Sequence, residues 1–204
     1  MPKRNSTLVS LVRFLGRVFI NYYKNYNVLY ENTGVLNDFE KKGFIILANH
    51  WSNLDPLLEG ILLRDVIKRE AYYAMCKNIK RRGFLEWVGG VRNKKDIYET
   101  LFKDLIEMGE ILVIHPEDKR RYKQKFDVED ECCIKCFENL LKMQRQIEKP
   151  VDIIPLAIGY EDVYKRGSLI HVCIGEPMKF ESNIEEISEH LDREINPILE
   201  RYLK

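Results

Sequence analysis

Residues 43–56 read Gly-Phe-Ile-Ile-Leu-Ala-Asn-His-Trp-Ser-Asn-Leu-Asp-Pro. An unbroken apolar run of this kind is typical of a strand that is buried on both faces of a sheet. Asp55 and Pro56 then mark the start of a helix, because Asp caps helices well and Pro fits the first helical position. A buried strand followed by a polar loop and a helix indicates an α/β sheet. Such sheets carry their sites at the carboxyl ends of the strands.

The rest of the chain alternates in the same way between strands and helices. Strands are expected at residues 28–31, 71–75, 111–114, 153–158 and 169–174, and helices at 57–68, 96–108, 130–147 and 184–203. This order predicts the α/β class, with a mixed, mostly parallel sheet wrapped by helices. Because the chain has 204 residues, of which 45% are apolar, a single domain is expected.

An N-terminal amphipathic helix is expected before the first strand. Its apolar residues recur at spacings of three and four, at Leu8, Leu11, Val12, Leu15, Val18, Phe19 and Tyr22. The stripe has two interpretations: packing on the core, or lying in a membrane interface with Arg13 and Arg17 toward anionic head groups. We therefore divide the chain into residues 1–26, a candidate membrane-interface anchor, and residues 27–204, the candidate catalytic domain.

Composition excludes some classes of protein. The 33 Lys and Arg residues are balanced by 32 Asp and Glu residues, which argues against a nucleic-acid partner, although basic residues gather in the middle of the chain, where they could hold phosphate groups. The longest stretch without a charged residue, 43–54, is too short to cross a bilayer. Five Cys residues and no secretory signal favour a cytoplasmic protein.

The loop after the strand at 43–48 holds a histidine and a carboxylate. Asp55 lies five residues after His50, so its carboxylate could accept a hydrogen bond from the imidazole Nδ1 and leave Nε2 to take a proton from a hydroxyl. Alternatively, Asp55 is only a helix cap and His50 a core histidine. The pair alone leaves both interpretations open.

Further motifs accompany this pair. Asn49-His50-x4-Asp55 resembles the signature of the glycerolipid acyltransferase superfamily, typified by 1-acylglycerol-3-phosphate acyltransferases. Residues 115–121 read His-Pro-Glu-Asp-Lys-Arg-Arg, where the family has Phe-Pro-Glu-Gly-Thr-Arg-Ser. Residues 83–94 resemble the family's glycine and arginine block, and residues 150–157 resemble its Val-Pro-Ile-Val-Pro-Val strand. These blocks follow one another in the family's order.

The resemblance implies a reaction and a site. His50 would be the general base and Asp55 its partner, in transfer of a fatty acyl group from an acyl-CoA or acyl-carrier-protein thioester to the hydroxyl of a lysophospholipid acceptor. Contacts with the acceptor are implied for Asn49, Arg92, Lys94, Glu117, Lys119 and Arg120. The implied protein would be peripheral on a membrane surface, take part in phospholipid biosynthesis or remodelling, and need neither a metal nor another cofactor.

The block at residues 115–121 departs from the family pattern. Asp118 replaces a glycine, which places a carboxylate where a phosphate would approach. Lys119 replaces a threonine. These departures support an alternative, a catalytically silent relative that binds lipid or membrane. The complete His50 and Asp55 motif supports the enzyme.

Two other groups of residues are expected to be structural. Cys132, Cys133 and Cys136 are too few for a zinc site, and Cys133 and Cys136 share a helical stripe with apolar residues. His171 interrupts an apolar strand, so a structural role is expected. His115 is not assigned a structural role: it follows a strand and is close in sequence to Glu117, so it could line the site, although the sequence identifies no partner for it.

Overall fold

One mixed β-sheet forms the centre of the molecule. The computed structural model describes residues 5–23, 25–75, 89–92, 97–117, 122–180 and 183–203. Within these residues the strands lie in the order β1-β7-β6-β2-β5-β3-β4, and β8 pairs with β6. Their bounds are β1 Asn27–Glu31, β2 Phe44–Ala48, β3 Ala71–Met75, β4 Gly90–Arg92, β5 Ile111–Ile114, β6 Val151–Tyr160, β7 Leu169–Ile174 and β8 Met178–Phe180.

Parallel pairing brings the ends of the central strands to one edge. Strand β2 pairs in parallel with β5 on one side and with β6 on the other, and β3 pairs in parallel with β5 and β4. Only β7 and β8 run antiparallel, both against β6. Every residue of β2 and β5 is buried, as expected for strands covered on both faces. The α/β class and the mixed, mostly parallel sheet are confirmed.

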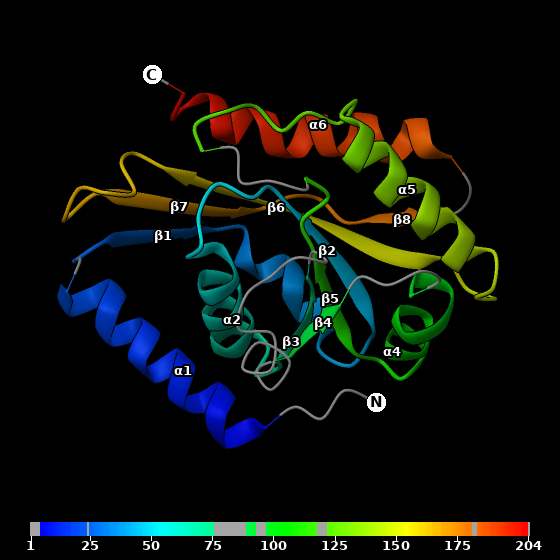
Figure 1. The fold of residues 1–204 in the computed structure, drawn as a ribbon, viewed down its shortest axis with the longest axis horizontal. Helices are drawn as coiled ribbons and strands as arrows, with labels where there is room; N and C mark the ends of the chain where they lie inside the picture. The colour runs from blue at the N-terminus through cyan, green and yellow to red at the C-terminus, as the bar shows by residue number, and fades with distance from the viewer. Residues whose placement is uncertain are drawn as a thin grey trace.

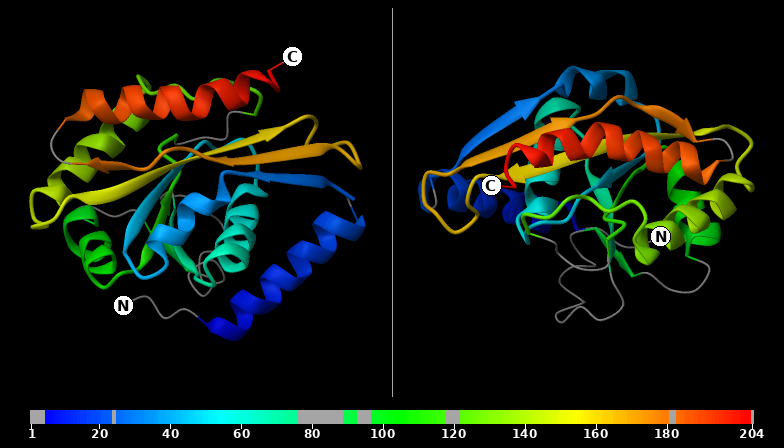
Figure 2. Two further views of the ribbon diagram at one scale, coloured as in Figure 1. Left: turned by 180° about the vertical axis from the view of Figure 1, so that it is seen from behind. Right: turned by 90° about the horizontal axis from the view of Figure 1, so that it is seen from above.

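Helices cover both faces of this sheet. Figures 1 and 2 show α1 (Ser6–Val18) and α2 (Asp55–Val66) on one face, and α5 (Glu131–Gln144) and α6 (Ile184–Glu200) on the other. Two further segments, η3 (Tyr98–Phe102) and α4 (Lys103–Glu107), form the connection into β5. Strand β2 therefore leads into α2 on one face, while β5 leads into α5 on the other, as right-handed crossovers require.

The N-terminal helix α1 packs on α2 through its small and basic side. A Cβ atom at Gly16 would lie 2.4 Å from Leu57, so the two helices touch there. Arg13 pairs with Glu70 at 2.5 Å, and Arg17 pairs with Asp65. The predicted direction of both arginines toward head groups is wrong, because they bind carboxylates of the domain itself.

The apolar stripe of α1 faces away from the domain. Phe14 is 63% exposed, and the neighbouring exposed side chains are Leu11, Leu15, Val18 and Phe19, the last in η1 (Phe19–Tyr23). Core packing is therefore wrong for most of the stripe: among its side chains that the structure describes, only Leu8 and Val12 are half-buried. No helix among the described residues has the length and apolar character needed to span a membrane.

Some elements differ from the sequence prediction. Strands β4 and β8 and the 3₁₀ segment η2 (Thr33–Phe39) are additional, and each is too short or irregular to show a periodic pattern. The predicted helix at 96–108 is divided into η3 and α4. Cys133 and Cys136 are buried beside Phe137 and Leu140, so their predicted place in the core is confirmed.

Candidate active site

The site lies at the carboxyl ends of β2 and β5. His50 is two residues beyond β2, and His115 follows β5 directly. Because Leu47 pairs with Ile114 in register, the two histidines leave the sheet side by side. Their rings are in contact, with centroids 4.5 Å apart.

His50 and Asp55 form the predicted hydrogen-bonded pair. Nδ1 of His50 lies 3.1 Å from Oδ2 of Asp55, which is the first residue of α2. Oδ2 also accepts the backbone N–H groups of Trp51 at 2.9 Å and Ser52 at 2.8 Å. An oxygen that receives two amide protons acts as an acceptor, so Nδ1 carries a proton and Nε2 is left as the basic nitrogen. The His50 side chain is 22% exposed, which allows Nε2 to meet a substrate.

Tyr160 holds the second oxygen of Asp55. Its hydroxyl donates to Oδ1 at 2.5 Å from the last residue of β6. Burial, and next the negative charge of Asp55, raise the pKa of Tyr160 well above its ordinary value, so the phenol remains a donor. Asp55 is completely buried, and its charge is met by these four donors. Tyr160 was missed in the sequence because no local pattern links it to Asp55.

Glu117 and Asn49 fix the backbone on either side of His50. Oε2 of Glu117 accepts the backbone N–H of His50 at 3.0 Å. The Asn49 amide donates to the carbonyl of Ile158 at 3.0 Å and accepts the N–H of Ile158 at 2.7 Å. Both side chains are buried. Asn49 therefore extends the pairing between β2 and β6 with its side chain, and its amide atoms are engaged within the protein.

A second histidine–carboxylate pair lies against the first. Nε2 of His115 is 3.0 Å from Oε1 of Glu59, which lies one helical turn after Asp55 on α2. Burial by itself lowers the pKa of His115, but the carboxylates of Glu59, Asp55 and Glu117 together outweigh burial and raise it. The sequence offered one unused signal for this pair: an acidic residue at the i+4 position on a helix face that is otherwise apolar.

The predicted phosphate-binding residues are only partly described. The backbone of Arg92 ends β4, which places it at the same edge of the sheet as His50. Lys94, Lys119 and Arg120 lie outside the described residues. Their predicted contact with the acceptor stays a prediction.

Two groups of side chains have the atom types of metal ligands. One is His50, Asp55 and His115, and the other is Glu31, His171 and Cys173; in each group the ligand atoms lie within 4.8 Å of one another. In the first group, hydrogen bonds to Glu59, to the backbone and between His50 and Asp55 engage the nitrogen and oxygen atoms that face one another. We therefore interpret it as a proton-transfer site.

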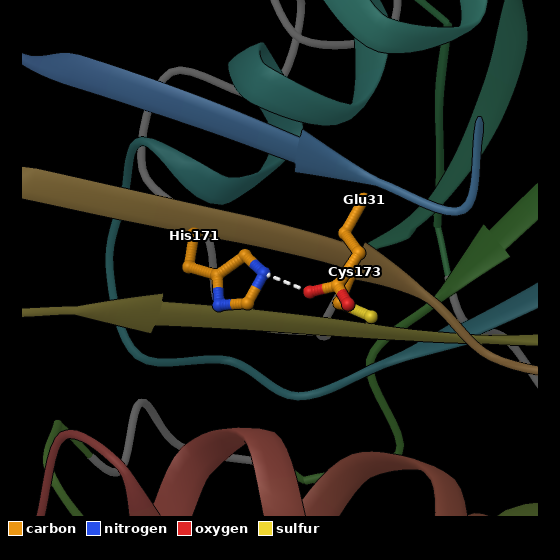
Figure 3. A group of neighbouring side chains, drawn as sticks. All are labelled: Glu31, His171 and Cys173. Atoms are coloured by element: carbon orange, nitrogen blue, oxygen red, sulfur yellow. Dashed lines mark hydrogen bonds and ion pairs between the residues drawn. The ribbon is translucent and has the colours of Figure 1, made fainter.

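The second group ties β1 to β7 (Figure 3). Nε2 of His171 lies 2.6 Å from Oε2 of Glu31, and the sulfur of Cys173 is beside that carboxylate. Burial, and next the charge of Glu31, raise the pKa of Cys173 to about 11, which keeps it a thiol at neutral pH. The hydrogen bond between His171 and Glu31 therefore adds a side-chain link to the backbone pairing of β1 with β7.

The geometry suits removal of a proton from a hydroxyl. A buried carboxylate orients the His50 imidazole through Nδ1, and the partly exposed ring leaves Nε2 for a substrate hydroxyl. The residue types and distances match a general base with its orienting group. No hydrogen bond to Nε2 of His50 occurs among the residues that the structure describes, so this nitrogen is available for a substrate.

The fold is shared with a protein of solved structure. The crystal structure of the 1-acyl-sn-glycerophosphate (LPA) acyltransferase PlsC from Thermotoga maritima matches over 95% of this chain and 79% of that chain, with a TM-score of 0.65 and 15% sequence identity. No protein-family model matches the sequence, and no curated protein sequence matches it significantly. The match confirms the glycerolipid acyltransferase fold that the motif blocks implied.

Proposed function

We propose that this chain is an O-acyltransferase that moves a fatty acyl group from a CoA or acyl-carrier-protein thioester to the hydroxyl of a lysophospholipid, such as 1-acylglycerol-3-phosphate. The observation that carries the proposal is the bond between Nδ1 of His50 and Oδ2 of Asp55, on a His50 side chain that is 22% exposed. The fold match and the order of the four motif blocks support the same reaction.

The reaction needs one proton shuttle. Nε2 of His50 takes the proton of the acceptor hydroxyl as its oxygen bonds to the thioester carbonyl carbon. The carbon–sulfur bond then breaks, and the leaving thiolate takes the proton back from His50. Asp55 stabilises the imidazolium between these steps, while Tyr160 and two backbone amides hold Asp55 in place. No covalent acyl-enzyme is needed.

The acceptor would bind through its phosphate. Arg92 at the end of β4, together with Lys94, Lys119 and Arg120, supplies positive charge for this purpose, and guanidinium groups bind phosphate oxygens in pairs. Glu117 accepts the backbone N–H of His50, and its main role is to hold the backbone of His50 in place. Asn49 holds the other side of His50 in place, because its side chain joins the end of β2 to β6.

One experiment tests the reaction. Purified protein is incubated with labelled acyl-CoA or acyl-carrier-protein and a panel of lysolipids with different head groups, and products are identified by mass. His50→Ala should lower the rate by about 10²- to 10⁴-fold. His190→Ala is the matched control, since His190 bonds to the backbone of Glu176 on the α6 side of the sheet. No product with any pair, or an undiminished rate in folded His50→Ala, would instead favour a silent lipid-binding relative.

We also propose that α1 lies on a membrane surface. The helix exposes apolar side chains at Leu11, Phe14, Leu15 and Val18. An exposed apolar face of this kind is typical of helices that lie in a membrane interface. Phe14→Asp with Leu15→Asp should release the protein from sedimented anionic vesicles while leaving its thermal transition in place. Tyr164→Asp, which changes an aromatic outside α1 that is 79% exposed and contacts Tyr122, is the control and should not release it. Equal release by both variants, or by neither, refutes the attachment.

A further inference from the structure

His115 and Glu59 form a buried pair that the proposed chemistry does not use. Their side chains are 10% and 0% exposed, and the Nε2–Oε1 distance is 3.0 Å. Glu59 Oε2 is buried and has no hydrogen-bond partner among the described residues. A buried carboxylate with so few donors is costly unless a positive charge lies beside it. His115 is the group placed to carry that charge.

The surroundings of His115 are mainly acidic. Glu59 and Asp55 face it from α2, Glu117 lies two residues away on its own segment, and His50 touches its ring from the β2 loop. Three carboxylates and one imidazole are therefore the titratable groups that reach it among the described residues. This environment favours a proton on His115, in agreement with the raised pKa described above.

The contact between the two rings links this charge to the general base. Two imidazolium ions with centroids 4.5 Å apart repel each other, so a proton on His115 opposes a second proton on His50. A general base must be unprotonated when the substrate arrives. A proton on His115 would thus favour the reactive form of His50.

We propose that His115, held by Glu59, is a positioning residue that divides the protons between the two histidines, so that His115 is charged and His50 is neutral at neutral pH. The effect on rate rests on the acyl transfer proposed above, whereas the charge assignment does not. The motif that residues 115–121 resemble has phenylalanine at the position of His115, so an uncharged ring is compatible with this place in the fold.

NMR tests the charge assignment without any substrate. The chain has four histidines, so ¹⁵N-labelled imidazole signals can be assigned with His115→Phe and His50→Ala. At pH 7, His115 should show the shifts of an imidazolium and His50 those of a neutral ring protonated on Nδ1. Glu59→Gln should make His115 neutral at that pH. A neutral His115 or a charged His50 in the unaltered protein at pH 7 overturns the proposal.

The pH dependence of kcat/KM tests the consequence. His115→Phe and Glu59→Gln should each move the acidic limb to higher pH by about one unit, because a neighbouring positive charge is lost. His171→Phe is the matched control, as it removes an imidazole that is bonded to Glu31 and packs against Tyr202, beyond the end of α6. A purely structural role would lower stability and the plateau rate without moving the limb. An unmoved limb in folded His115→Phe refutes the proposal.

The two proposals fail in different ways. If the unaltered protein transfers no acyl group, the proposed function fails, and the NMR titration still decides where the protons lie. If acyl transfer proceeds but the NMR titration places the neutral-pH proton on His50, only the role of His115 fails.

Discussion

Asp55→Asn removes the charge beside the general base and keeps the shape of the side chain. The amide oxygen can take the place of Oδ2 and accept from Trp51 and Ser52, while the amide nitrogen faces the Tyr160 hydroxyl, which can accept as well as donate. The fold should therefore survive. His50 loses the negative charge that stabilises its protonated form during the reaction.

The size of the loss follows from the distance. Two unit charges 3.1 Å apart interact by about 5 kcal/mol at an effective dielectric constant of about 20, and by about half of that at twice the dielectric constant. The partial exposure of His50 places it between these limits. Each 1.4 kcal/mol is about tenfold in rate, so kcat should fall by roughly 10²- to 10⁴-fold.

The assay is acyl transfer to the best acceptor of the lysolipid panel, with stability measured by urea unfolding. Asp130→Asn is the matched control, because Asp130 caps α5 by accepting the N–H of Cys132, and Asn caps helices about equally well. The control should keep its rate. A folded Asp55→Asn protein that retains more than a tenth of the rate refutes the electrostatic argument.

Three further predictions concern stability. Asn49→Leu leaves the N–H and carbonyl of Ile158 unpaired in the core and should lower the free energy of unfolding by about 2–4 kcal/mol in urea titrations; an unchanged midpoint contradicts this. Gly43→Ala places a Cβ atom 2.3 Å from the backbone oxygen of Ile106 and should cost about 1–3 kcal/mol, while Gly34→Ala, with open space around it, should cost less than half as much. The raised pKa of His115 stabilises the fold fully below its unfolded pKa of about 6.5, so the stability advantage over His115→Phe should shrink as pH rises above that value; a growing advantage reverses the sign.

Much of the site could be predicted from the sequence because its main residues are close together along the chain. His50 and Asp55 are five residues apart across a strand end and a helix start, so strand burial and helix capping already place them together. The family resemblance implied that Glu117 belongs to the same site, and the β2–β5 pairing provides the contact. Long apolar strands and amphipathic helices were predicted for the same reason: their patterns repeat within a few residues.

Contacts between distant segments could not be predicted in this way. Tyr160 reaches Asp55 across 105 positions, and Glu59 reaches His115 across 56, through strand order that no local pattern specifies. The direction of α1 is a similar case. Its periodicity showed that one face is apolar, but Gly16 packs on Leu57 and the arginines pair with Glu70 and Asp65, and these tertiary contacts turn the apolar face outward. Periodicity by itself therefore determined which residues share a face, and only the packing of α1 against α2 decided which face the domain covers.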